Sequence, residues 1–305
     1  MTRHFITLRD LDRSTLADII AKSRLMKAER AAGTRRPILA GKALALIFER
    51  PSTRTRVSFD RAMRELGGDA VVLSESEMQI SRGESIADTA RVLSRYVDAI
   101  MIRARRHEDV VELAAHADVP VINGLTNRSH PCQLMADLIT LAEKKGPLER
   151  TRVAWTGDAN NMMMTWLEAA EIFGFEFAIA TPPEMPPSPT AIGAALAHGA
   201  RVRVAKDAID AVADADCVVT DTWVSMGDTD VEWRHKVLAP YSVTSRLMAA
   251  AKPDAIFMHC LPAHRGEEVD AAVMDGPQSV VFDEAENRLH AQKGILAWCL
   301  GADRD

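Results

Sequence analysis

The sequence predicts an α/β protein of two domains, each a mainly parallel β-sheet flanked by helices. Two observations lead to this fold class. Short, continuous apolar runs alternate with longer segments of helical period, a pattern typical of parallel sheets covered by helices on both faces. The chain also has 305 residues, enough for about two domains of roughly 150 residues, each with a hydrophobic core of its own.

The apolar runs that we interpret as strands occur in both halves of the chain. Each is short and continuous, as expected of a strand that is buried on both faces of its sheet. The predicted strands are 43–48, 70–73, 99–102 and 120–122 in the first half, then 153–155, 177–180, 201–204, 217–220, 255–258 and 279–282.

Helical patterns lie between these strands, and the clearest covers residues 85–97. Ser85 and Asp88 predict a capping box at its start. Its apolar positions recur at spacings of four, three and four, which makes one side of the helix apolar. These positions are Ile86, Ala90, Leu93 and Val97. Residues 289–300 predict a final helix.

The best candidate for a domain boundary is the segment 144–150, Lys-Lys-Gly-Pro-Leu-Glu-Arg. It is charged, it contains a Gly-Pro break, and it lies between a predicted helix and a new strand. We therefore expect one domain over residues 1–145 and a second that begins at residue 150.

Composition and charge exclude several classes of protein. The 37 Lys and Arg against 43 Asp and Glu give a net charge of −6, so we expect no nucleic-acid partner. No apolar run is long enough for a membrane helix, and the first residues lack the apolar segment of a signal peptide. We therefore expect a cytoplasmic protein without a membrane partner. The four cysteines are too few for a disulfide framework.

Polar side chains follow most of the predicted strands. In open parallel sheets the ligand crevice lies outside the carboxyl ends of the strands, so these positions are the first candidates for chemistry. They are 52–56, 74–79, Arg103, Asn160 with Asn161, Asp221, and His259 with Cys260.

Residues 52–56, Ser-Thr-Arg-Thr-Arg, follow a buried strand and open a helix. Free backbone N–H groups and the helix dipole attract an anion there, and hydroxyl and guanidinium groups add hydrogen bonds to phosphate oxygens. The alternative is an ordinary N-cap with two solvated arginines. Three hydroxyls and two guanidiniums within five residues favour a phosphate site. Neither common nucleotide-binding glycine motif occurs in the chain.

Four motifs together resemble the aspartate and ornithine carbamoyltransferases. They are Ser-Thr-Arg-Thr-Arg at 52–56, His-Pro-Cys-Gln at 130–133, His-Cys-Leu-Pro at 259–262 and Arg-Leu-His-Ala at 288–291. They occur in the order of the family and cover nearly the full chain. The resemblance implies two α/β domains with the active site in the cleft between them. It also implies that a C-terminal helix, about 285–305, joins the carbamoyl phosphate domain, which leaves 150–285 as the ornithine domain.

The resemblance implies a carbamoyl phosphate site in the first domain. Arg103, His130 and the Thr55 hydroxyl would point donors at the carbonyl oxygen, which gains negative charge during attack. The Gln133 side-chain oxygen and backbone carbonyls near Cys260 and Leu261 would accept from the amide. The implied residues are Ser52, Thr53, Arg54, Thr55, Gln79, Arg103, His130, Pro131, Cys132, Gln133, Cys260, Leu261 and Arg288. Taken singly, His130 is more often a structural histidine and Arg103 a surface charge.

The acceptor side of the implied site lies in the second half of the chain. Residues 221–227 resemble the Asp-x-x-x-Ser-Met-Gly loop of the ornithine branch of the family. Asp221 would pair with the α-ammonium of L-ornithine and Asn161 with its amino-acid head, while Ser225 and Met226 close over the chain. The alternative for Asp221 is an ordinary helix cap. Of all these residues, Arg103, His130, Asp221 and Cys260 are the predicted catalytic ones.

The loop 74–84 separates a strand from a helix and is long and polar. In the family this loop reaches into a neighbouring subunit, and Gln79 stands at the position that contacts carbamoyl phosphate. The resemblance therefore implies a homotrimer with shared active sites. Residues 74–84 contain no lysine, whereas aspartate carbamoyltransferases carry one in this loop. This difference argues against aspartate as the acceptor.

The sequence therefore predicts transfer of the carbamoyl group from carbamoyl phosphate to the δ-amine of L-ornithine, giving L-citrulline and phosphate, in arginine metabolism. There are two alternatives. One is a sister enzyme that uses putrescine or an acylated ornithine, and the other is a catalytically silent anion-binding protein of the same fold. No cofactor is expected. No metal is expected either, because the His and Cys residues at 130, 132, 259, 260 and 264 lack zinc-site spacing.

Overall fold

The computed structural model describes residues 2–79, 83–224 and 229–303. Its packing divides the chain into two compact units. Unit 1 comprises residues 1–136 and 286–305, and unit 2 comprises residues 137–285. The chain passes between them within two helices, α5 (Pro131–Lys145) and α12 (Val281–Cys299). The domain boundary predicted at 144–150, a segment that begins in the last turn of α5, stays a prediction.

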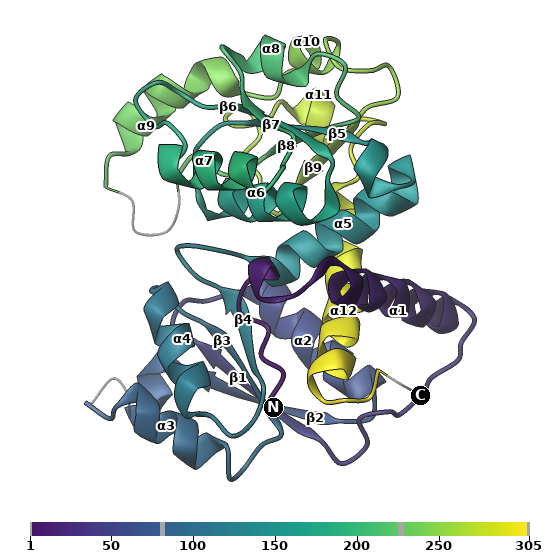
Figure 1. Cartoon of the computed structure of the whole chain (residues 1–305), viewed down its shortest axis with the longest axis vertical. Helices are drawn as coiled ribbons and strands as arrows, with labels where there is room; N and C mark the ends of the chain where they lie inside the picture. Colours follow the sequence, from purple (N-terminus) through teal and green to yellow (C-terminus); the bar gives the residue numbers. More distant parts are fainter. Residues whose placement is uncertain (1, 80–82, 225–228, 304–305) are drawn as a thin grey trace. The chain divides into compact units, whose positions relative to one another are not determined.

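Unit 1 contains a four-stranded, wholly parallel sheet in the order β2-β1-β3-β4 (Figure 1). Its strands are β1 (Ala43–Phe48), β2 (Asp69–Ser74), β3 (Ala99–Arg103) and β4 (Val121–Leu125). Its other helices are α1 (Arg13–Ala31), α2 (Thr53–Glu65), α3 (Ile86–Leu93) and α4 (His107–His116).

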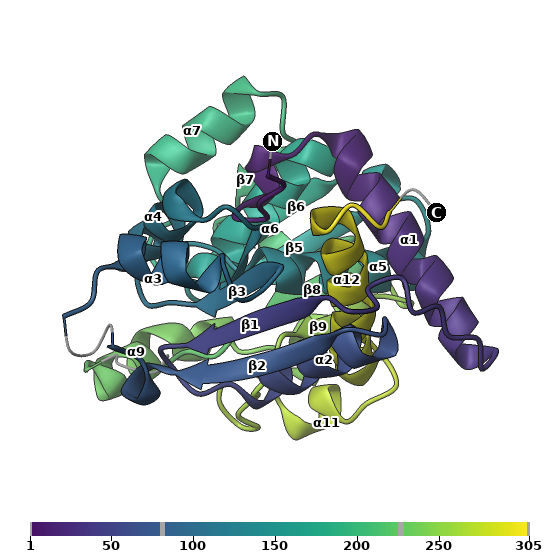
Figure 2. The same cartoon turned by 90° about the horizontal axis from the view of Figure 1, so that it is seen from below.

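One face of the unit 1 sheet packs on α3 and α4. Ala45 and Ile100 belong to the same buried cluster as Ala90 of α3 and Leu113 of α4. Their alternate neighbours on the strands point to the opposite face, because successive side chains of a strand alternate. Helix α2 packs against β1 and β2 (Figure 2). The apolar runs that predicted β1, β3 and β4 are therefore mostly buried, whereas the edge strand β2 is half-buried or exposed along its length.

Unit 2 contains a five-stranded parallel sheet in the order β7-β6-β5-β8-β9. Its strands are β5 (Arg152–Thr156), β6 (Glu176–Ala180), β7 (Val202–Val204), β8 (Cys217–Thr220) and β9 (Ile256–His259). Its helices are α6 (Asn161–Phe173), α7 (Pro189–Ala197), α8 (Ala208–Val212), α9 (Val231–Leu238), α10 (Ser245–Met248) and α11 (Ala271–Met274).

Aromatic side chains hold α6 on the unit 2 sheet. Trp166 of α6 stacks on Phe177 of β6 with ring centroids 6.4 Å apart, and its edge meets Phe175 at 5.8 Å. A second buried cluster joins Ala154 and Phe257 of the sheet to helices that include α8 and α11. This sheet is also covered on both faces, as its continuous apolar strands predicted.

Most predicted strands are confirmed, but the strand at 279–282 is wrong. Ser279 makes a single bridge to Phe257, and α12 begins at Val281. A short apolar run cannot by itself distinguish a strand from a helix start. Here Asp283 and Glu284 occupy the first turn of the helix, where its dipole favours acidic side chains. The final helix is consequently longer than predicted.

The predicted cap at the start of helix α3 is confirmed. The Ser85 hydroxyl accepts from the backbone N–H of Asp88 at 3.0 Å. The helix itself ends at Leu93 rather than at Val97. Apolar spacing continues beyond that end because the following turn still packs Val97 against the cluster on this face.

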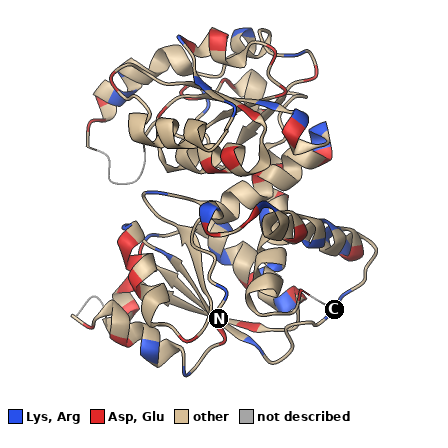
Figure 3. Cartoon of the chain, in the orientation of Figure 1, with Lys and Arg blue, Asp and Glu red and all other residues tan. Residues whose placement is uncertain are grey.

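Charged side chains of both signs are spread over the elements of each unit (Figure 3), in keeping with the small net charge. Of the helices described, none combines the length and the apolar character that a membrane span requires.

Gly294 of α12 lies where this helix touches α1. A Cβ atom at this position would collide with the Ser23 hydroxyl and lie 2.8 Å from the carbonyl oxygen of Ile19. We therefore expect Gly294→Ala to lower the free energy of unfolding by about 1–3 kcal/mol, because two helix backbones would have to separate. Urea unfolding of the purified protein measures this change.

Gly193 in the exposed helix α7 is the matched control, since a Cβ atom there meets no heavy atom within 4 Å. Gly193→Ala is expected to raise the free energy of unfolding by about 0.4–1 kcal/mol. Equal effects of the two substitutions would contradict the close approach of α12 to α1.

Candidate active site

The predicted phosphate site begins at Ser52, which caps helix α2 directly after strand β1. The Ser52 hydroxyl accepts from the backbone N–H of Thr55 at 3.3 Å. Nη1 of Arg103, the last residue of β3, donates to the same hydroxyl at 3.2 Å. Ser52 is therefore the N-cap of α2, and a guanidinium from a neighbouring strand lies at the same place. Both features favour an anion at the start of α2.

Arg288 links three helices of unit 1. From α12, its guanidinium donates to the Thr55 hydroxyl of α2 at 3.1 Å and to Oε1 of Gln133 in α5. All three side chains are buried. The motifs at 52–56, 130–133 and 288–291 therefore meet in one place. We name Ser52, Arg54, Thr55, Arg103, His130, Gln133 and Arg288 the unit 1 cluster.

His130 lies among the positive charges of this cluster. Burial holds its pKa well below the usual range of histidine, and the guanidinium groups of Arg288, Arg103 and Arg54 lower the pKa further. The imidazole is therefore neutral at pH 7. The three guanidiniums leave this part of unit 1 positive without a contribution from His130, as a site for a doubly charged phosphate requires.

The other predicted carbamoyl phosphate residues of unit 1 differ in their exposure and contacts. Thr53 and Gln79 are exposed. Pro131 is buried at the first position of α5. The Cys132 thiol is directed to the backbone of β4, where it donates to the carbonyl of Asn123 at 3.3 Å. Burial raises the pKa of Cys132 to about 12, so this thiol stays protonated.

Asp221 is the centre of the candidate acceptor site in unit 2. It follows strand β8 and is buried. Its Oδ2 accepts from Nδ2 of Asn160 at 2.7 Å, and its Oδ1 accepts from the N–H of Thr222 at 2.8 Å and from the Cys260 thiol at 3.2 Å. Loops after β5, β8 and β9 thus converge on one carboxylate. We name Asn160, Asn161, Asp221, Cys260 and Leu261 the unit 2 cluster.

The half-buried Cys260 thiol is a hydrogen-bond donor at neutral pH. Burial raises its pKa well above the usual range of cysteine, and the Asp221 carboxylate raises it further. A thiolate nucleophile is therefore disfavoured at this position. We therefore expect Cys260 to line the site without forming a covalent intermediate.

The turn that carries Cys260 is held by its neighbours. The N–H of Leu261 donates to Nδ1 of His259 at 2.9 Å, and the N–H of His259 donates to Oε2 of Glu284 at 2.9 Å. Leu261 has a φ of 60°, a left-handed conformation that a branched residue rarely adopts. The backbone near Cys260 and Leu261, whose carbonyls are predicted to accept from the carbamoyl amide, is therefore held in an unusual conformation.

Asn161 is half-buried at the first position of α6, next to the cap residue Asn160. Ser225 and Met226, the other predicted ornithine residues, lie outside the described residues.

Asp221, His259 and Cys260 have ligand atoms within 4.8 Å of one another, a spacing that a metal ion can use. In this structure Nδ1 of His259 accepts from a backbone N–H and the Cys260 thiol donates to Asp221. The expectation of no metal stays a prediction.

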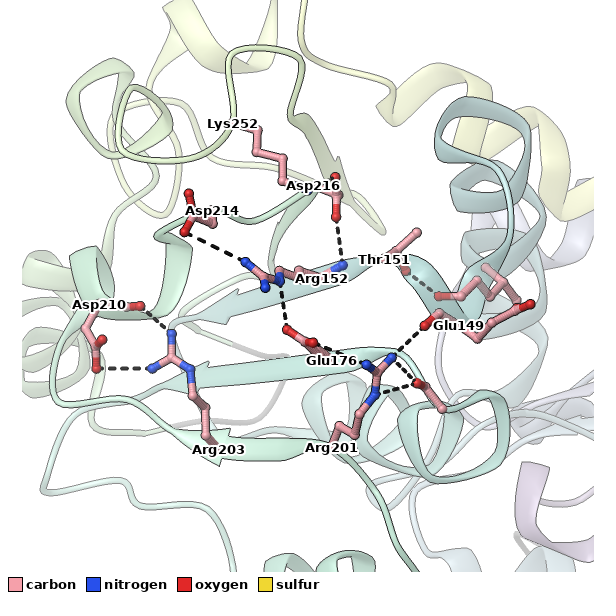
Figure 4. Close-up of polar contacts among 12 residues, drawn as sticks. Glu149, Thr151, Arg152, Glu176, Arg201, Arg203, Asp210, Asp214, Asp216 and Lys252 are labelled. Atoms are coloured by element: carbon pink, nitrogen blue, oxygen red, sulfur yellow. Dashed lines mark hydrogen bonds and ion pairs between the residues drawn. The ribbon is translucent and has the colours of Figure 1, made fainter.

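The opposite edge of the unit 2 sheet carries a network of charges instead of a catalytic cluster (Figure 4). Arg152 and Arg201 flank Glu176 at 2.8 and 3.2 Å, and Arg203 lies 3.2 Å from Asp210. Each of these guanidiniums is paired with a carboxylate. Arg152 begins β5 and Glu176 begins β6, so their ion pair lies at the amino ends of these two strands. Arg203 of β7 pairs instead with α8, the helix that follows this strand.

Asn160 is the contact of Asp221 that sequence reasoning did not select. The resemblance implied Asn161 as the ligand residue and gave Asn160 no role, although asparagine directly before a helix is a common N-cap. Its amide oxygen does cap α6. Its amide nitrogen contacts Asp221, a residue 61 positions later, and no local pattern could predict that contact.

The hydrogen bond between Cys260 and Asp221 gives a testable prediction. At pH 8 we expect iodoacetamide to label Cys260 more slowly than an ordinary partly exposed cysteine, because little thiolate is present. Asp221→Asn removes the charge that raises the pKa, so labelling should become several-fold faster. Peptide mass spectrometry measures the rate, and the buried Cys132, Cys217 and Cys299 serve as internal controls. An unchanged rate in the variant would contradict the proposed coupling.

Comparison with known proteins assigns both halves of the chain. Residues 3–143 match the model of the aspartate/ornithine carbamoyltransferase carbamoyl-P binding domain, and residues 149–299 match that of the Asp/Orn binding domain. The ornithine carbamoyltransferase of Bradyrhizobium diazoefficiens is 61% identical over 98% of both chains. That of Rhizobium meliloti is 55% identical over 99% of this chain and 100% of its own.

Solved structures give the same result. The ornithine carbamoyltransferase from Pyrococcus furiosus has a TM-score of 0.94 and 47% identity over 98% of this chain and 97% of its own. The enzyme from Campylobacter jejuni has a TM-score of 0.92 and 39% identity, over 99% and 100%. With both domain models matched and this identity over nearly the whole length, the chain belongs to the aspartate/ornithine carbamoyltransferase family.

Proposed function

We propose that this chain transfers the carbamoyl group of carbamoyl phosphate to the δ-amine of L-ornithine, giving L-citrulline and phosphate. The observation that carries the proposal is the buried Asp221 carboxylate, held by three hydrogen bonds in the domain that matches the Asp/Orn binding model. The names of the relatives in Bradyrhizobium diazoefficiens and Pyrococcus furiosus agree with ornithine as the acceptor.

In this proposal, the unit 1 cluster binds carbamoyl phosphate. The start of α2 and the guanidiniums of Arg54 and Arg288 hold the phosphate. Arg103, Thr55 and the neutral His130 point donors at the carbonyl oxygen and stabilise the charge that develops on it. Oε1 of Gln133 accepts from Arg288, and the same amide oxygen is the proposed acceptor for the carbamoyl NH₂. Arg288 thereby orients Gln133 as well as binding the anion.

The unit 2 cluster binds ornithine in this proposal. Asp221 receives the α-ammonium, and Asn161 bonds the amino-acid head. The δ-amine then attacks the carbamoyl carbon, and the bond from that carbon to the phosphate oxygen breaks. The amine must lose a proton, and its ordinary pKa of about 10.4 leaves little neutral amine at pH 7. The lowered pKa of the buried His130 makes its imidazole a weak base, and the raised pKa of Cys260 keeps its thiol protonated, so neither group is suited to remove this proton. The departing phosphate is therefore the proposed acceptor.

That both clusters contact the same carbamoyl phosphate molecule stays a prediction. The other contributions that stay predictions are those of Thr53, Gln79, Pro131, Cys132, Leu261, Ser225 and Met226. A cytoplasmic location and a role in arginine metabolism stay predictions too.

The acceptor is tested by Asp221→Asn. The variant loses the charge that would hold the α-ammonium, and one oxygen facing Asn160 becomes an NH₂ group. We expect kcat/KM for ornithine to fall roughly tenfold to hundredfold, while KM for carbamoyl phosphate changes little. Colorimetric citrulline and carbamoyl-product assays with ornithine, putrescine, N-acetylornithine and aspartate measure the preference. Wild-type preference for putrescine, or normal use of ornithine by the variant, would refute the assignment of ornithine.

We also propose that the protein acts as a homotrimer in which Gln79 serves the active site of a neighbouring subunit. The Gln79 side chain is exposed, which is compatible with this role. Gln79→Ala would then spoil a donated loop, and Arg103→Ala would spoil the receiving cluster.

Mixing and reassembling these two inactive variants should restore activity, because some sites of a mixed trimer combine an intact loop with an intact cluster. Each variant reassembled with itself is the control. Continued inactivity of the mixture, with subunit exchange verified by native mass spectrometry, would indicate that each subunit has a self-contained site.

A further inference from the structure

Asn160 uses both ends of its side-chain amide. Its Oδ1 accepts from the backbone N–H groups of Met162 at 2.9 Å and Met163 at 3.2 Å, which caps helix α6. Its Nδ2 donates to Oδ2 of Asp221 at 2.7 Å. Because the two N–H groups fix which end of the amide is oxygen, the NH₂ group must face Asp221. One side chain thus connects the start of a helix to the carboxylate proposed to bind ornithine.

The carboxylate of Asp221 is held from both sides as a result. Its Oδ1 accepts from Thr222 and Cys260, while Oδ2 accepts from Asn160. A carboxylate has about four lone-pair directions. The three bonds fix the plane of the group and leave acceptor capacity for an incoming ammonium.

The loop that carries Asn160 is itself anchored. The Asp158 carbonyl accepts from Nε1 of Trp155 at 2.9 Å, and the Asp158 carboxylate accepts from the guanidinium of Arg234. Nε of Arg234 also donates to the carbonyl of Trp223, two residues beyond Asp221, at 2.6 Å. Two connections therefore join the loops after β5 and β8. One runs through Arg234, and the other is the hydrogen bond from Asn160 to Asp221, the carboxylate proposed to bind ornithine.

We propose that Asn160 is a positioning residue that orients Asp221 for the acceptor amino acid, an inference that rests on the proposed function. The requirement is specific to an asparagine amide. Serine can cap the helix but is too short to bond Asp221 as well. Aspartate can cap the helix but presents an oxygen to Asp221 in place of a donor.

The test separates these two tasks of Asn160. Asn160→Ser keeps a capping hydroxyl and removes the donor to Asp221. We expect KM for ornithine to rise and kcat/KM for ornithine to fall roughly tenfold, while KM for carbamoyl phosphate stays within about twofold of wild type. Ser188→Ala is the matched control, because Ser188 caps the exposed helix α7 through Ala191 and takes no part in either cluster. It should lower the melting temperature slightly and leave both KM values unchanged.

The pH dependence of kcat/KM in Asn160→Asp distinguishes a positioning role from a purely structural one. The introduced carboxyl group caps the helix but faces Asp221, and two carboxyl groups this close share a proton at lower pH. The shared proton restores a donor to Asp221, and its loss at higher pH leaves two repelling charges. The ratio of kcat/KM for ornithine in the variant to that in wild type should therefore fall as the pH rises from about 6 to 9. The same ratio for Asn160→Ser should not depend on pH.

Three outcomes would overturn the inference. Asn160→Ser could use ornithine as well as wild type does, the ratio for Asn160→Asp could be independent of pH, or both variants could lose affinity for the two substrates equally along with thermal stability. The last result would make Asn160 a structural cap only. The wild-type assay reports on the proposed function separately, because failure of wild type to carbamoylate ornithine would refute that function before any variant is compared.

Discussion

All strand pairs within each sheet are parallel, and both clusters depend on this constraint. Parallel strands bring their carboxyl ends to the same edge of a sheet, so loops that are far apart in the sequence become neighbours there. In unit 1, Ser52 after β1 meets Arg103 at the end of β3. In unit 2, the loops after β5, β8 and β9 meet at Asp221. Antiparallel pairing would have sent these side chains to opposite edges.

Burying charge at such an edge requires partners, and the partners here also prepare the chemistry. Arg288 is buried, and it is stabilised by Thr55 and Gln133, the groups proposed to contact the substrate. Asp221 is buried and stabilised by Asn160, Thr222 and Cys260. Because these bonds fix the side chains in place, little reorganisation is needed when a ligand binds. The same surroundings keep His130 neutral and Cys260 protonated.

Helix α12 brings the last motif of the sequence to the unit 1 cluster. Gly294 permits close contact with α1, and Lys293 makes a buried ion pair of 2.7 Å with Glu65 at the end of α2. Arg288 bonds Thr55 near the start of α2. Helices α2 and α12 are therefore joined at both ends of α2. Losing either partner of a buried ion pair is costly, since the other charge would remain unpaired.

The sequence by itself determined the features that local chemistry controls. Continuous apolar runs identified most strands, Ser52 and Ser85 identified two helix starts, and the motif at 52–56 predicted an anion site. The failed strand at 279–282 also has a local cause, because a short apolar run suits a strand or a helix start equally. Tertiary structure decided where Val281 belongs.

Only the tertiary structure decided which side chains share a cluster and in which protonation state. The pairing of Asn160 with Asp221, the direction of the Cys132 thiol and the neutrality of His130 depend on groups distant in sequence. Burial and Coulomb energy depend on distances in space, and the order of residues along the chain does not contain those distances. The sequence could therefore predict the types of residue in the candidate site, but the orientation of each depends on the packed sheets and helices around it.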